Sequence, residues 1–439
     1  MIDVQKPYSV GLYTLGCKVS QYETEAIGEE FERRGFVVKN YGEKNDVYLI
    51  NTCTVTAESD RKSRQMIRRA IKKNPDAKVL VVGCYSQRSP LEVAKIAGVS
   101  AVLGSADKLS AVDIAIKLLE SDAADPIISV TDIDKADFEP MCITRAPRTR
   151  AYVKIEDGCE CRCSYCAIPS ARGRVRSKPR EDVVSEVEGL YASGVREIVL
   201  TGIETASYGK DFSYPYSLAD LIVELDRRHS CERLRLGSLA PELIGEAFIE
   251  KVKGAKILAP HFHLSMQSGS DSVLRGMKRR YSAAMAQRNV SLLKKAFPTA
   301  HFTTDMMVGF PGESEENFLE TVDFVRRIGF LDVHVFAYSR REGTPAASYD
   351  CQIDEAVKRE RSERLIRVAQ AVRDGLLDEI VRSGKSSTVI LENYADGKYT
   401  AHSDSFVEFS VEAAPGLCGE MREVRPVSQK DGVIYAEII

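Results

Sequence analysis

The N-terminal third of the chain alternates short apolar runs with segments of helical periodicity. Apolar runs typical of buried strands occur at Val10–Leu15, Val47–Ile50 and Val79–Val82. A helical pattern follows each run, and one of these patterns covers Glu58–Lys73 and ends at Pro75. This order predicts a parallel α/β sheet domain over residues 1–122.

A second alternation begins at Ala151. Its strand candidates are Tyr152–Ile155, Glu197–Leu200, Arg233–Ser238, His261–Ser265, Phe302–Val308 and Asp332–Ala337. The helical segments between them include Arg180–Ala192, Ser282–Ala296 and Glu315–Ile328. Six strand–helix units predict a (β/α)6 partial TIM barrel over residues 145–382 and not a closed barrel of eight units.

The remaining segments predict a linker and a third domain. Residues 123–144 are rich in Asp, Pro and Thr with little helical periodicity, which is typical of a linker. A long helical pattern at Asp354–Arg382 precedes a change of pattern over residues 383–439. The strand-like runs there are Thr388–Leu391, Phe406–Val411, Met421–Val427 and Val433–Ile438. They predict a small all-β, OB-like barrel, so the expected fold class is α/β with three domains.

Composition narrows the class of protein. The 439 residues are 44% hydrophobic and 28% charged, which is typical of a globular protein and excludes a disordered or fibrous one. No apolar run reaches the roughly 18 residues of a membrane span, and the first residues lack a secretory signal, so we expect a cytoplasmic protein. Its 11 cysteines are then expected to be reduced, as metal ligands, reactive thiols or small core residues.

The densest chemical signal is a group of four cysteines in the loop after the first barrel strand. Cys159, Cys161, Cys163 and Cys166 lie within eight residues. Thiolates in such a group suit zinc or an iron–sulfur cluster. The absence of a second CxxC or His pair nearby favours iron–sulfur, in a C-x3-C-x2-C pattern of Cys159, Cys163 and Cys166. Spacing alone leaves open whether Cys161 replaces one of its neighbours.

A second set of cysteines is dispersed but regular. Cys17, Cys53 and Cys84 each lie just past the end of a predicted parallel strand. Open α/β sheets gather their ligands at this edge, so the three thiols are candidates for one metal site. The residues alone leave open whether three cysteines stand there by accident.

Several motifs together resemble a known family. The C-x3-C-x2-C motif in a βα barrel resembles the radical S-adenosylmethionine (SAM) superfamily. Further motifs resemble its methylthiotransferases: Leu15–Glu23, Asn51–Thr56, Val82–Tyr85, Ser265–Ser270, Val308–Glu313 and Tyr338–Ala346. Details in Lys18–Glu23, Thr54–Thr56 and Met277–Tyr281 are similar to the threonylcarbamoyladenosine tRNA branch. Sister branches modify isopentenyladenosine in tRNA or an aspartate of a ribosomal protein.

The resemblance implies two 4Fe–4S clusters and SAM as cofactors. Cys159, Cys163 and Cys166 would hold the radical SAM cluster, and Cys17, Cys53 and Cys84 an auxiliary cluster. One electron would cleave SAM to a 5′-deoxyadenosyl radical, which takes hydrogen from carbon 2 of the tRNA adenosine. The auxiliary cluster would hold the methylated sulfur. No catalytic side chain is expected beyond the two clusters.

The resemblance also places candidate SAM contacts at the barrel mouth. They are Tyr165, Thr201, Gly202, Glu204, Ser238, Gln267, Ser268, Gly309 and Phe310, the last of which is expected to pack on the adenine. Two positions depart from the family pattern. Glu204 stands where His or Asn is expected, and Ala240 stands where Glu is frequent.

Two basic segments suggest an RNA-binding surface, although the formal net charge of the whole chain is −3. Residues 143–180 carry ten Lys/Arg against three acids, and Arg61–Lys73 carries seven Lys/Arg and no acid. The expected RNA contacts are Arg61, Lys62, Arg64, Arg68, Arg172, Arg174 and Arg176. Arg172, Arg174 and Arg176 are alternatively expected to serve the SAM carboxylate. The C-terminal barrel resembles an RNA-binding TRAM domain, but it is acidic.

The expected partners follow from this chemistry. They are a tRNA substrate, a one-electron donor such as flavodoxin or ferredoxin, and a sulfur donor that the sequence does not identify, with no membrane partner. We expect a monomer. A hypothesis of another class is a non-catalytic metal-binding protein that binds RNA.

Overall fold

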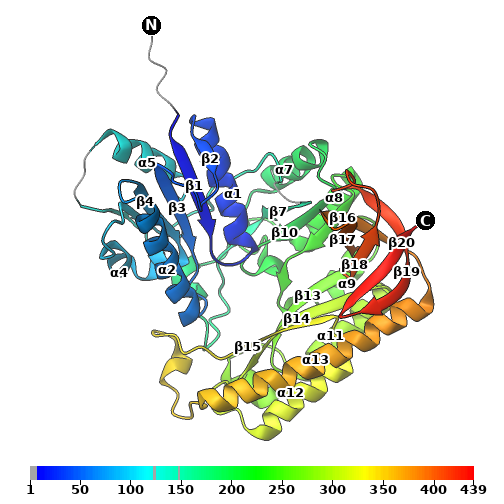
Figure 1. The fold of residues 1–439 in the computed structure, drawn as a ribbon. Helices are drawn as coiled ribbons and strands as arrows, with labels where there is room; N and C mark the ends of the chain where they lie inside the picture. The colour runs from blue at the N-terminus through cyan, green and yellow to red at the C-terminus, as the bar shows by residue number, and fades with distance from the viewer. Residues whose placement is uncertain (1–6, 122–124, 147–148) are drawn as a thin grey trace.

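The computed structural model describes residues 7–121, 125–146 and 149–439 (Figure 1). An N-terminal α/β part, a central barrel and a small C-terminal barrel follow one another along the chain. The N-terminal part and the C-terminal barrel lie at opposite sides of the central barrel (Figure 1). None of the helices of these ranges is both long and apolar enough to cross a membrane.

The N-terminal part is a parallel sheet with helices on it. Within the described ranges its six strands run in the order β2-β1-β3-β4-β5-β6. The strands are β1 (Ser9–Thr14), β2 (Val37–Lys39), β3 (Val47–Thr52), β4 (Lys78–Gly83), β5 (Ala101–Leu103) and β6 (Ile127–Ser129). The helices are α1 (Lys18–Arg33), α2 (Ala57–Lys73), α3 (Cys84–Arg88), α4 (Pro90–Ala94) and α5 (Ser110–Glu120). Strand β3 is buried on both faces, which explains its continuous apolar sequence.

The three apolar runs predicted as strands here form β1, β3 and β4. The short strands β2, β5 and β6 were not predicted, because three residues are too few to show an alternating pattern. Strand β6 lies inside residues 123–144, the segment predicted to be a linker, and pairs with β5 in parallel. Part of that segment therefore completes the sheet.

The central part is an open parallel barrel. Its strands are β7 (Arg150–Lys154), β10 (Glu197–Thr201), β11 (Arg233–Leu236), β12 (Ser238–Leu239), β13 (His261–Gln267), β14 (His301–Val308) and β15 (Asp332–Ala337). They pair in the orders β11-β10-β7 and β12-β13-β14-β15. The predicted strand Arg233–Ser238 is thus divided at Gly237, whose amide bonds back to the carbonyl of Leu200 at 2.7 Å. Counting β11 and β12 as one, six strand positions are present in the described residues, as the (β/α)6 prediction requires.

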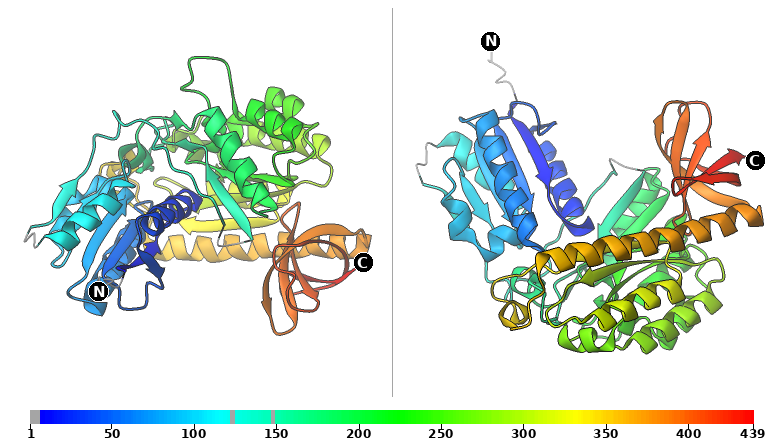
Figure 2. Two further views of the ribbon diagram at one scale, coloured as in Figure 1. Left: turned by 90° about the horizontal axis from the view of Figure 1, so that it is seen from above. Right: turned by 60° about the horizontal axis from the view of Figure 1, so that its bottom comes forward.

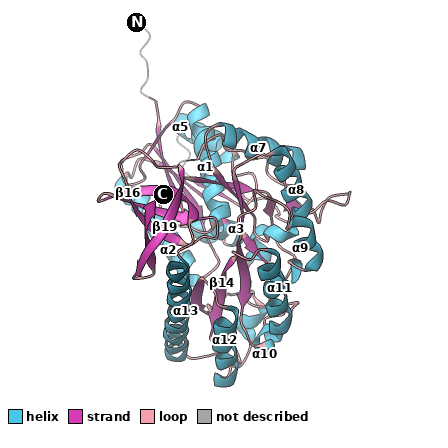
Figure 3. Cartoon of the chain, turned by 90° about the vertical axis from the view of Figure 1, so that its right-hand side faces the viewer, coloured by secondary structure: helices cyan, strands magenta, loops and turns pink. Residues whose placement is uncertain are grey.

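Helices cover the outside of this barrel, as Figure 3 shows for α7–α12. They are α7 (Arg180–Ala192), α8 (Leu218–Arg228), α9 (Glu246–Val252), α10 (Asp271–Gly276), α11 (Ala283–Ala296) and α12 (Glu315–Ile328). Short elements follow β7 in the cysteine loop region: β8 (Glu156–Asp157), α6 (Ile168–Arg172) and β9 (Arg176–Ser177). Helix α13 (Glu355–Ser383) runs along the barrel and leads to the C-terminal domain (Figure 2).

The C-terminal domain is a closed five-stranded barrel in the order β16-β17-β18-β20-β19. Its strands are β16 (Ser387–Ala395), β17 (Lys398–Ser403), β18 (Glu408–Glu412), β19 (Met421–Lys430) and β20 (Val433–Ile438). The closed barrel confirms the OB-like prediction, although β17 had no strand candidate of its own. Its sequence, KYTAHS, is too polar to stand out as an apolar run.

A buried ionic group joins the two barrels. The fully buried carboxylate of Glu197 accepts hydrogen bonds from Arg235 at 2.9 Å and 3.0 Å, and from Arg150 at 2.8 Å. Arg235 also donates to the backbone carbonyls of Ser403 and Asp404 in the C-terminal barrel. One carboxylate therefore aligns the guanidinium groups that hold the C-terminal barrel against the central one.

We expect Glu197→Gln to lower the free energy of unfolding by roughly 3–5 kcal/mol, because it leaves buried guanidinium groups without their counter-charge. Burial raises the pKa of Glu197, but Arg235, Arg150 and Arg233 together hold it well below its ordinary value. The stabilisation is therefore present above the carboxyl pKa of the unfolded chain and is lost as pH falls. Urea denaturation at pH 7 and pH 4.5 measures this effect. Glu232→Gln, at an exposed pair with Arg196, is the control and should change stability by less than about 1 kcal/mol.

Candidate metal centres and cofactor site

The first cysteine loop leaves the barrel after β8 at a turn that only glycine permits. Gly158 has φ +93°, and a Cβ atom there would lie 1.8 Å from the carbonyl oxygen of Arg174. The next residue is held in place as well, because the amide of Cys159 donates to the carbonyl of Gly173 at 3.0 Å. The first thiol therefore starts from a fixed backbone position.

The second half of the loop is fixed by Ser164. Its amide donates to the carbonyl of Met277 at 3.0 Å, and its hydroxyl donates to that of Gly276 at 2.8 Å. Its own carbonyl accepts from the amide of Ala346 at 2.8 Å. The loop is thus held between the end of α10 and the segment that follows β15.

Three of the four thiols of this loop line a cavity of 370 Å³. They are those of Cys159, Cys163 and Cys166, whereas Cys161 is not among the described residues that line it. Arg279 donates to the sulfur of Cys163 at 3.4 Å, and the amide of Ile168 approaches the sulfur of Cys166 at 3.4 Å. Donors of this kind favour the thiolate form that a metal needs. The three lining cysteines are those of the C-x3-C-x2-C pattern.

Cys161 and the thiols beside it differ in their pKa. A hydrogen bond from Cys159 lowers the pKa of Cys161 to about 6 against the opposing effect of burial, and Arg279 and Arg280 also lower it. Burial raises the pKa of Cys166 to about 12. A buried thiol of this kind loses its proton readily only when a metal cation binds it.

The second set of cysteines lies at one edge of the N-terminal sheet. Cys17 is the N-cap residue of α1, Cys53 directly follows β3, and Cys84 begins α3 after β4. Strands β1, β3 and β4 are neighbours, so their carboxyl ends lie side by side. A Cβ atom on Gly16 would lie 3.5 Å from the sulfur of Cys53. The pKa of Cys53 is raised to about 11 by burial first and then by Cys84 and Cys17. The three thiols therefore lie at the ends of neighbouring strands.

The described residues contain no group of three or more His, Cys, Asp or Glu side chains spaced to hold a single metal ion. Thiols that each bind a different iron of a cluster lie further apart than the ligands of one ion. Both sets consist of thiols alone, which is the donor type of iron–sulfur clusters. The donor chemistry of both sets therefore fits a cluster.

Arg172 connects the two sets. It ends α6, six residues after Cys166, and its side chain is fully buried. Its Nε donates to the sulfur of Cys84 at 3.0 Å, and its Nη1 donates to Glu23 of α1 at 2.5 Å. The same guanidinium contacts Asp157 at 3.2 Å. One side chain of the barrel loop thus touches a thiol of the other set.

Around Arg172 lies a buried ionic cluster, which we define as Glu23, Lys108, Lys154, Asp157, Arg172 and Arg176. Burial raises the pKa of Glu23, but Arg172, Lys108 and Lys154 more than offset this and hold it well below its ordinary value. The cluster combines α1 and the loop before α5 with the cysteine loop region of the barrel. It holds the two domains in one relative position.

This placement corrects part of the RNA prediction. Arg172 and Arg176 are 0% and 3% exposed and form ion pairs with acids in the interior, so they do not offer their charge to a phosphate. Lys154 and Lys178 of the same segment are buried against carboxylates as well. Counting charge along residues 143–180 did not include the acidic partners from α1 and α7. Arg174 is exposed, and its guanidinium contacts Asp137 at 3.4 Å and the carbonyls of Asp134 and Ala136.

The other predicted RNA contacts lie on α2. Lys62 and Arg68 are exposed, and Arg61 is exposed but paired with Glu58 at 2.5 Å. Arg64 is half-buried, with a hydrogen bond to the hydroxyl of Tyr85 at 3.0 Å. This helix begins close to the second cysteine set and presents its basic residues to solvent. Their role as RNA contacts stays a prediction.

Two predicted cofactor residues have features typical of a ligand site. Glu204 accepts a hydrogen bond from the amide of Ala240 at 2.9 Å, and burial raises its pKa to about 7. A carboxylate from position 204 therefore occupies the place where the resemblance expects a glutamate at 240. Gln267 ends β13 with φ +65°, and its buried Oε1 has no hydrogen-bond partner in the described residues. Strain and an unpaired acceptor are common where a ligand binds.

Other residues predicted to contact the cofactor have partners within the protein itself. Ser268 bonds to the hydroxyl of Thr321 at 3.1 Å, and the amide of Gly309 donates to Glu313 at 2.9 Å. Phe310 is buried, and its ring packs edge-on against Tyr338 and Tyr349, which accounts for it without an adenine. The others lie near the cysteine loop or at strand ends, with Tyr165 packed beside Phe310. They are Tyr165, Thr201, Gly202 and Ser238.

The interior of the open barrel holds charged residues that the sequence patterns did not single out. Asp305 of β14 contacts His263 at 3.2 Å and His334 at 3.1 Å. Hydrogen bonds to Asp305 and Asp332 raise the pKa of His334 to about 10. A single histidine in a sequence carries no spacing signal that would place it in a barrel.

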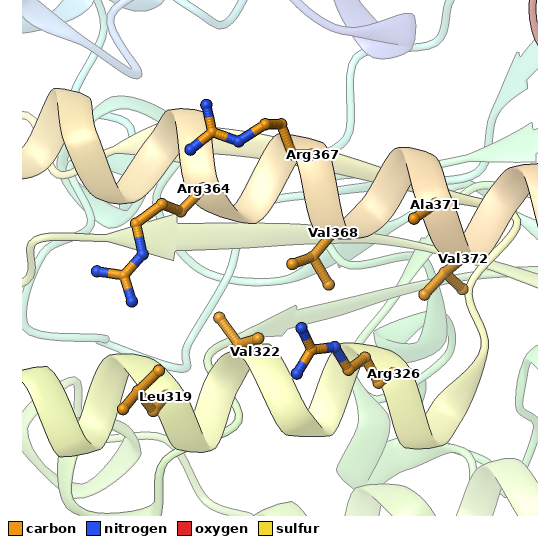
Figure 4. Close-up of a pocket in the computed structure, with 8 residues that line it drawn as sticks. All are labelled: Leu319, Val322, Arg326, Arg364, Arg367, Val368, Ala371 and Val372. Carbon is orange, nitrogen blue, oxygen red and sulfur yellow. The ribbon is translucent and has the colours of Figure 1, made fainter.

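Another pocket lies outside the barrel between α12 and α13 (Figure 4). It is lined by Leu319, Val322, Arg326, Arg364, Arg367, Val368, Ala371 and Val372. None of these is a cysteine, and its helices cover the outer surface. This pocket therefore offers no thiol ligand for a metal.

An open parallel barrel whose first loop carries a C-x3-C-x2-C motif defines a radical SAM enzyme. The family model described as "Radical SAM superfamily" matches residues 153–325, and "Uncharacterized protein family UPF0004" matches residues 9–104. A threonylcarbamoyladenosine tRNA methylthiotransferase, MtaB of Bacillus subtilis, is 39% identical, with 98% of this chain and 95% of the relative covered. MtaB of Thermotoga maritima is 36% identical over 97% of this chain and 96% of its own length.

A tRNA-2-methylthio-N(6)-dimethylallyladenosine synthase of Clostridioides difficile is 31% identical, covering 84% of this chain and 79% of its own. The chain belongs to the methylthiotransferase family of radical SAM enzymes. An iron–sulfur cluster and SAM are therefore cofactors of this protein. Among solved structures, the radical SAM methyltransferase TsrM from Kitasatospora setae, with cobalamin and a [4Fe-4S] cluster bound, has a TM-score of 0.55 at 18% identity, covering 78% of this chain and 77% of that chain. This likeness shows the fold alone.

We expect Arg172→Met to destabilise the protein by about 3–5 kcal/mol, because it leaves Glu23 and Asp157 buried with one cation fewer. It should also remove the hydrogen bond to the sulfur of Cys84 and lower the iron content of the anaerobically purified protein. The matched control is Arg174→Met, two residues away and exposed. Equal urea midpoints and equal iron contents in the two variants would contradict the role given to Arg172.

Proposed function

We propose that this protein transfers a methylthio group to carbon 2 of N6-threonylcarbamoyladenosine next to the anticodon of a tRNA. The proposal rests on one observation above all: Arg172, six residues after Cys166 in the barrel, donates to the sulfur of Cys84 in the other thiol set. A methylthiotransferase needs one centre to activate SAM and another to supply sulfur, close enough to act on the same carbon. The names of the MtaB relatives support the substrate.

The first thiol set supports the first of these roles. A reduced cluster with SAM supplies a carbon radical strong enough to take hydrogen from an adenosine C–H bond, which no side-chain acid or base achieves. Cys159, Cys163 and Cys166 would hold this cluster, with Cys161 outside the ligand set. The protein's own contribution is to orient the ligands, through Gly158 and Ser164, and to exclude water.

The second thiol set would hold a second 4Fe–4S cluster. Cys17, Cys53 and Cys84 supply three ligands, which leaves one iron open for the sulfur that is transferred. Arg172 donates to Cys84 and is itself fixed by Glu23. Such a donor stabilises negative charge on the thiolate and keeps the ligand in place.

The partners follow from the same role. The exposed basic residues of α2 would contact tRNA phosphates near the second thiol set, since a positive helix next to the reaction centre steers the RNA toward it. The reduction requires a one-electron donor such as flavodoxin or ferredoxin. We infer a cytoplasmic monomer, because its substrate is tRNA.

The second candidate substrate is isopentenyladenosine in tRNA. Relatives that carry this activity in their names are 30–34% identical to this chain, below the 39% of the Bacillus subtilis relative. A ribosomal protein aspartate is a third candidate, and a non-catalytic RNA-binding protein is the alternative of another class.

Nucleoside mass spectrometry of tRNA from a deletion strain tests the substrate. We expect 2-methylthio-N6-threonylcarbamoyladenosine to disappear and its unmodified precursor to accumulate, because no other centre would insert the group. Complementation with the wild-type gene should restore the product, and complementation with Cys17→Ala should not. Loss of the isopentenyl product instead would move the assignment to the sister branch.

Iron analysis after anaerobic reconstitution tests the two ligand sets. We expect about eight irons per chain, falling by about half when Cys159, Cys163 and Cys166 are all replaced by Ala. Cys161→Ala is the matched control in the same loop and should keep the full content. Cys17→Ala should still cleave SAM reductively without forming a methylthio product. Stoichiometric zinc in place of iron would overturn the assignment.

A further inference from the structure

The segment that follows β15 continues the central barrel along the chain but is attached to the N-terminal domain. The amide of Ala57, the first residue of α2, donates to the hydroxyl of Ser339 at 3.1 Å. Arg88, the last residue of α3, donates to the backbone carbonyl of Glu342 at 2.8 Å. Two helices that lie next to the second thiol set therefore both hold this segment, which runs past the end of α2 in Figure 1.

The side chain of Arg341, in the same segment, is buried at the loop that joins Cys53 to α2. Its Nη2 donates to the hydroxyl of Thr54 at 2.8 Å and to the carboxylate of Asp60 at 2.7 Å. Thr54 follows Cys53 directly and is fully buried, and Arg88 donates to the same hydroxyl at 3.4 Å. A guanidinium from the segment after β15 therefore fixes the position of the Cys53 loop.

The other end of the segment borders the cavity of the first thiol set. The amide of Thr344 donates to the carbonyl of Arg341 at 3.1 Å, which closes a four-residue turn. The third residue of this turn is Gly343 with φ +80°, a conformation that favours glycine. Gly343, Thr344 and Pro345 line the cavity of 370 Å³ together with the three thiols of the first set. The turn is therefore a wall of that cavity.

This turn joins the Cys53 loop to the cavity over a short distance. The first and last Cα atoms of such a turn, here those of Arg341 and Thr344, lie within about 7 Å of each other. A largely buried ion pair such as Arg341 with Asp60 adds little net stability, but it is satisfied in one arrangement only. The turn is therefore a spacer of fixed length between the Cys53 loop and the cavity of the first thiol set.

We propose that Arg341 is a positioning residue for the transfer of the methylthio group: it holds the Cys53 loop at a fixed place relative to the cavity of the first thiol set. This inference rests on the proposed function. Each transfer removes one hydrogen atom from carbon 2 and releases it in one molecule of 5′-deoxyadenosine. A coupled reaction therefore gives one 5′-deoxyadenosine for each methylthio product formed.

Displacement of the Cys53 loop would uncouple the two products. The carbon–sulfur bond would not form, because the sulfur would be out of reach of the carbon-2 radical. This radical would instead take one electron from the dithionite of the assay and one proton from water, which restores the carbon–hydrogen bond. 5′-Deoxyadenosine would then be released without a methylthio product.

The ratio of methylthio product to 5′-deoxyadenosine tests this role. The reconstituted protein is incubated with SAM, dithionite, sulfide and a stem-loop RNA that carries threonylcarbamoyladenosine, and both products are quantified by mass spectrometry. We expect Arg341→Met to lower the ratio at least about tenfold while 5′-deoxyadenosine formation stays within about twofold of the wild type, because a misplacement of about 1 Å costs up to about 100-fold. Asp60→Asn removes the charge that Arg341 faces and should also lower the ratio.

Hydrogen–deuterium exchange gives a readout that does not depend on the reaction. In the reconstituted protein without substrate, Arg341→Met should speed the exchange of the amides of residues 54–60 about tenfold or more and leave those of β3 unchanged, because only the loop loses its contacts. The matched control is Arg340→Met, one residue away and exposed, which should keep the wild-type exchange and the wild-type ratio. Iron content and circular dichroism check clusters and fold, and Asp60→Asn takes the place of Arg341→Met if the latter fails either check.

The outcomes distinguish the inference from the proposed function. An Arg341→Met protein with the wild-type ratio overturns the inference, and so does one in which both products fall by the same factor, since that result marks a loss of stability alone. Unchanged exchange of residues 54–60 overturns it as well. If the wild type releases 5′-deoxyadenosine but forms no methylthio product, the proposed function fails, and the exchange experiment alone decides whether Arg341 holds the Cys53 loop.

Discussion

The buried ionic cluster at the domain interface is the interaction on which the rest of the structure depends. Glu23 of the N-terminal domain, fully buried, is paired with Arg172, Lys108 and Lys154. Burying such charges is costly, and a well-packed apolar contact would stabilise the fold at least as well. What the ion pairs add is a defined relative position: the carboxylate is satisfied only when α1 and the cysteine loop region of the barrel meet in one arrangement. The N-terminal domain and the cysteine loop region of the barrel are therefore held together by electrostatics.

Arg172 connects the contact between the domains with a candidate metal ligand. The same guanidinium that is fixed by Glu23 and Asp157 donates to the sulfur of Cys84, so that docking of the domains and ordering of a metal ligand are one event. A chain whose domains separated would lose this donor and leave Glu23 without its main counter-charge. This explains why a residue expected on the RNA-binding surface lies at the centre of the molecule.

Carboxylates of the central barrel are also paired with basic side chains. Glu197 holds two arginines at the contact with the C-terminal barrel, and Asp305 is held by histidines. These carboxylates each pair with more than one basic side chain of the strands beside them.

The sequence by itself determined the local features: the apolar runs of β3 and β4, the six barrel positions, and the C-x3-C-x2-C loop. These depend on short-range periodicity and spacing, which a single chain displays directly. Three-residue strands such as β6 were missed, because so short a strand shows no period. Only the tertiary structure decided which charged side chains are buried and with which partners they pair. Arg172 was expected at the surface because its acidic partner Glu23 is about 150 residues away in the chain.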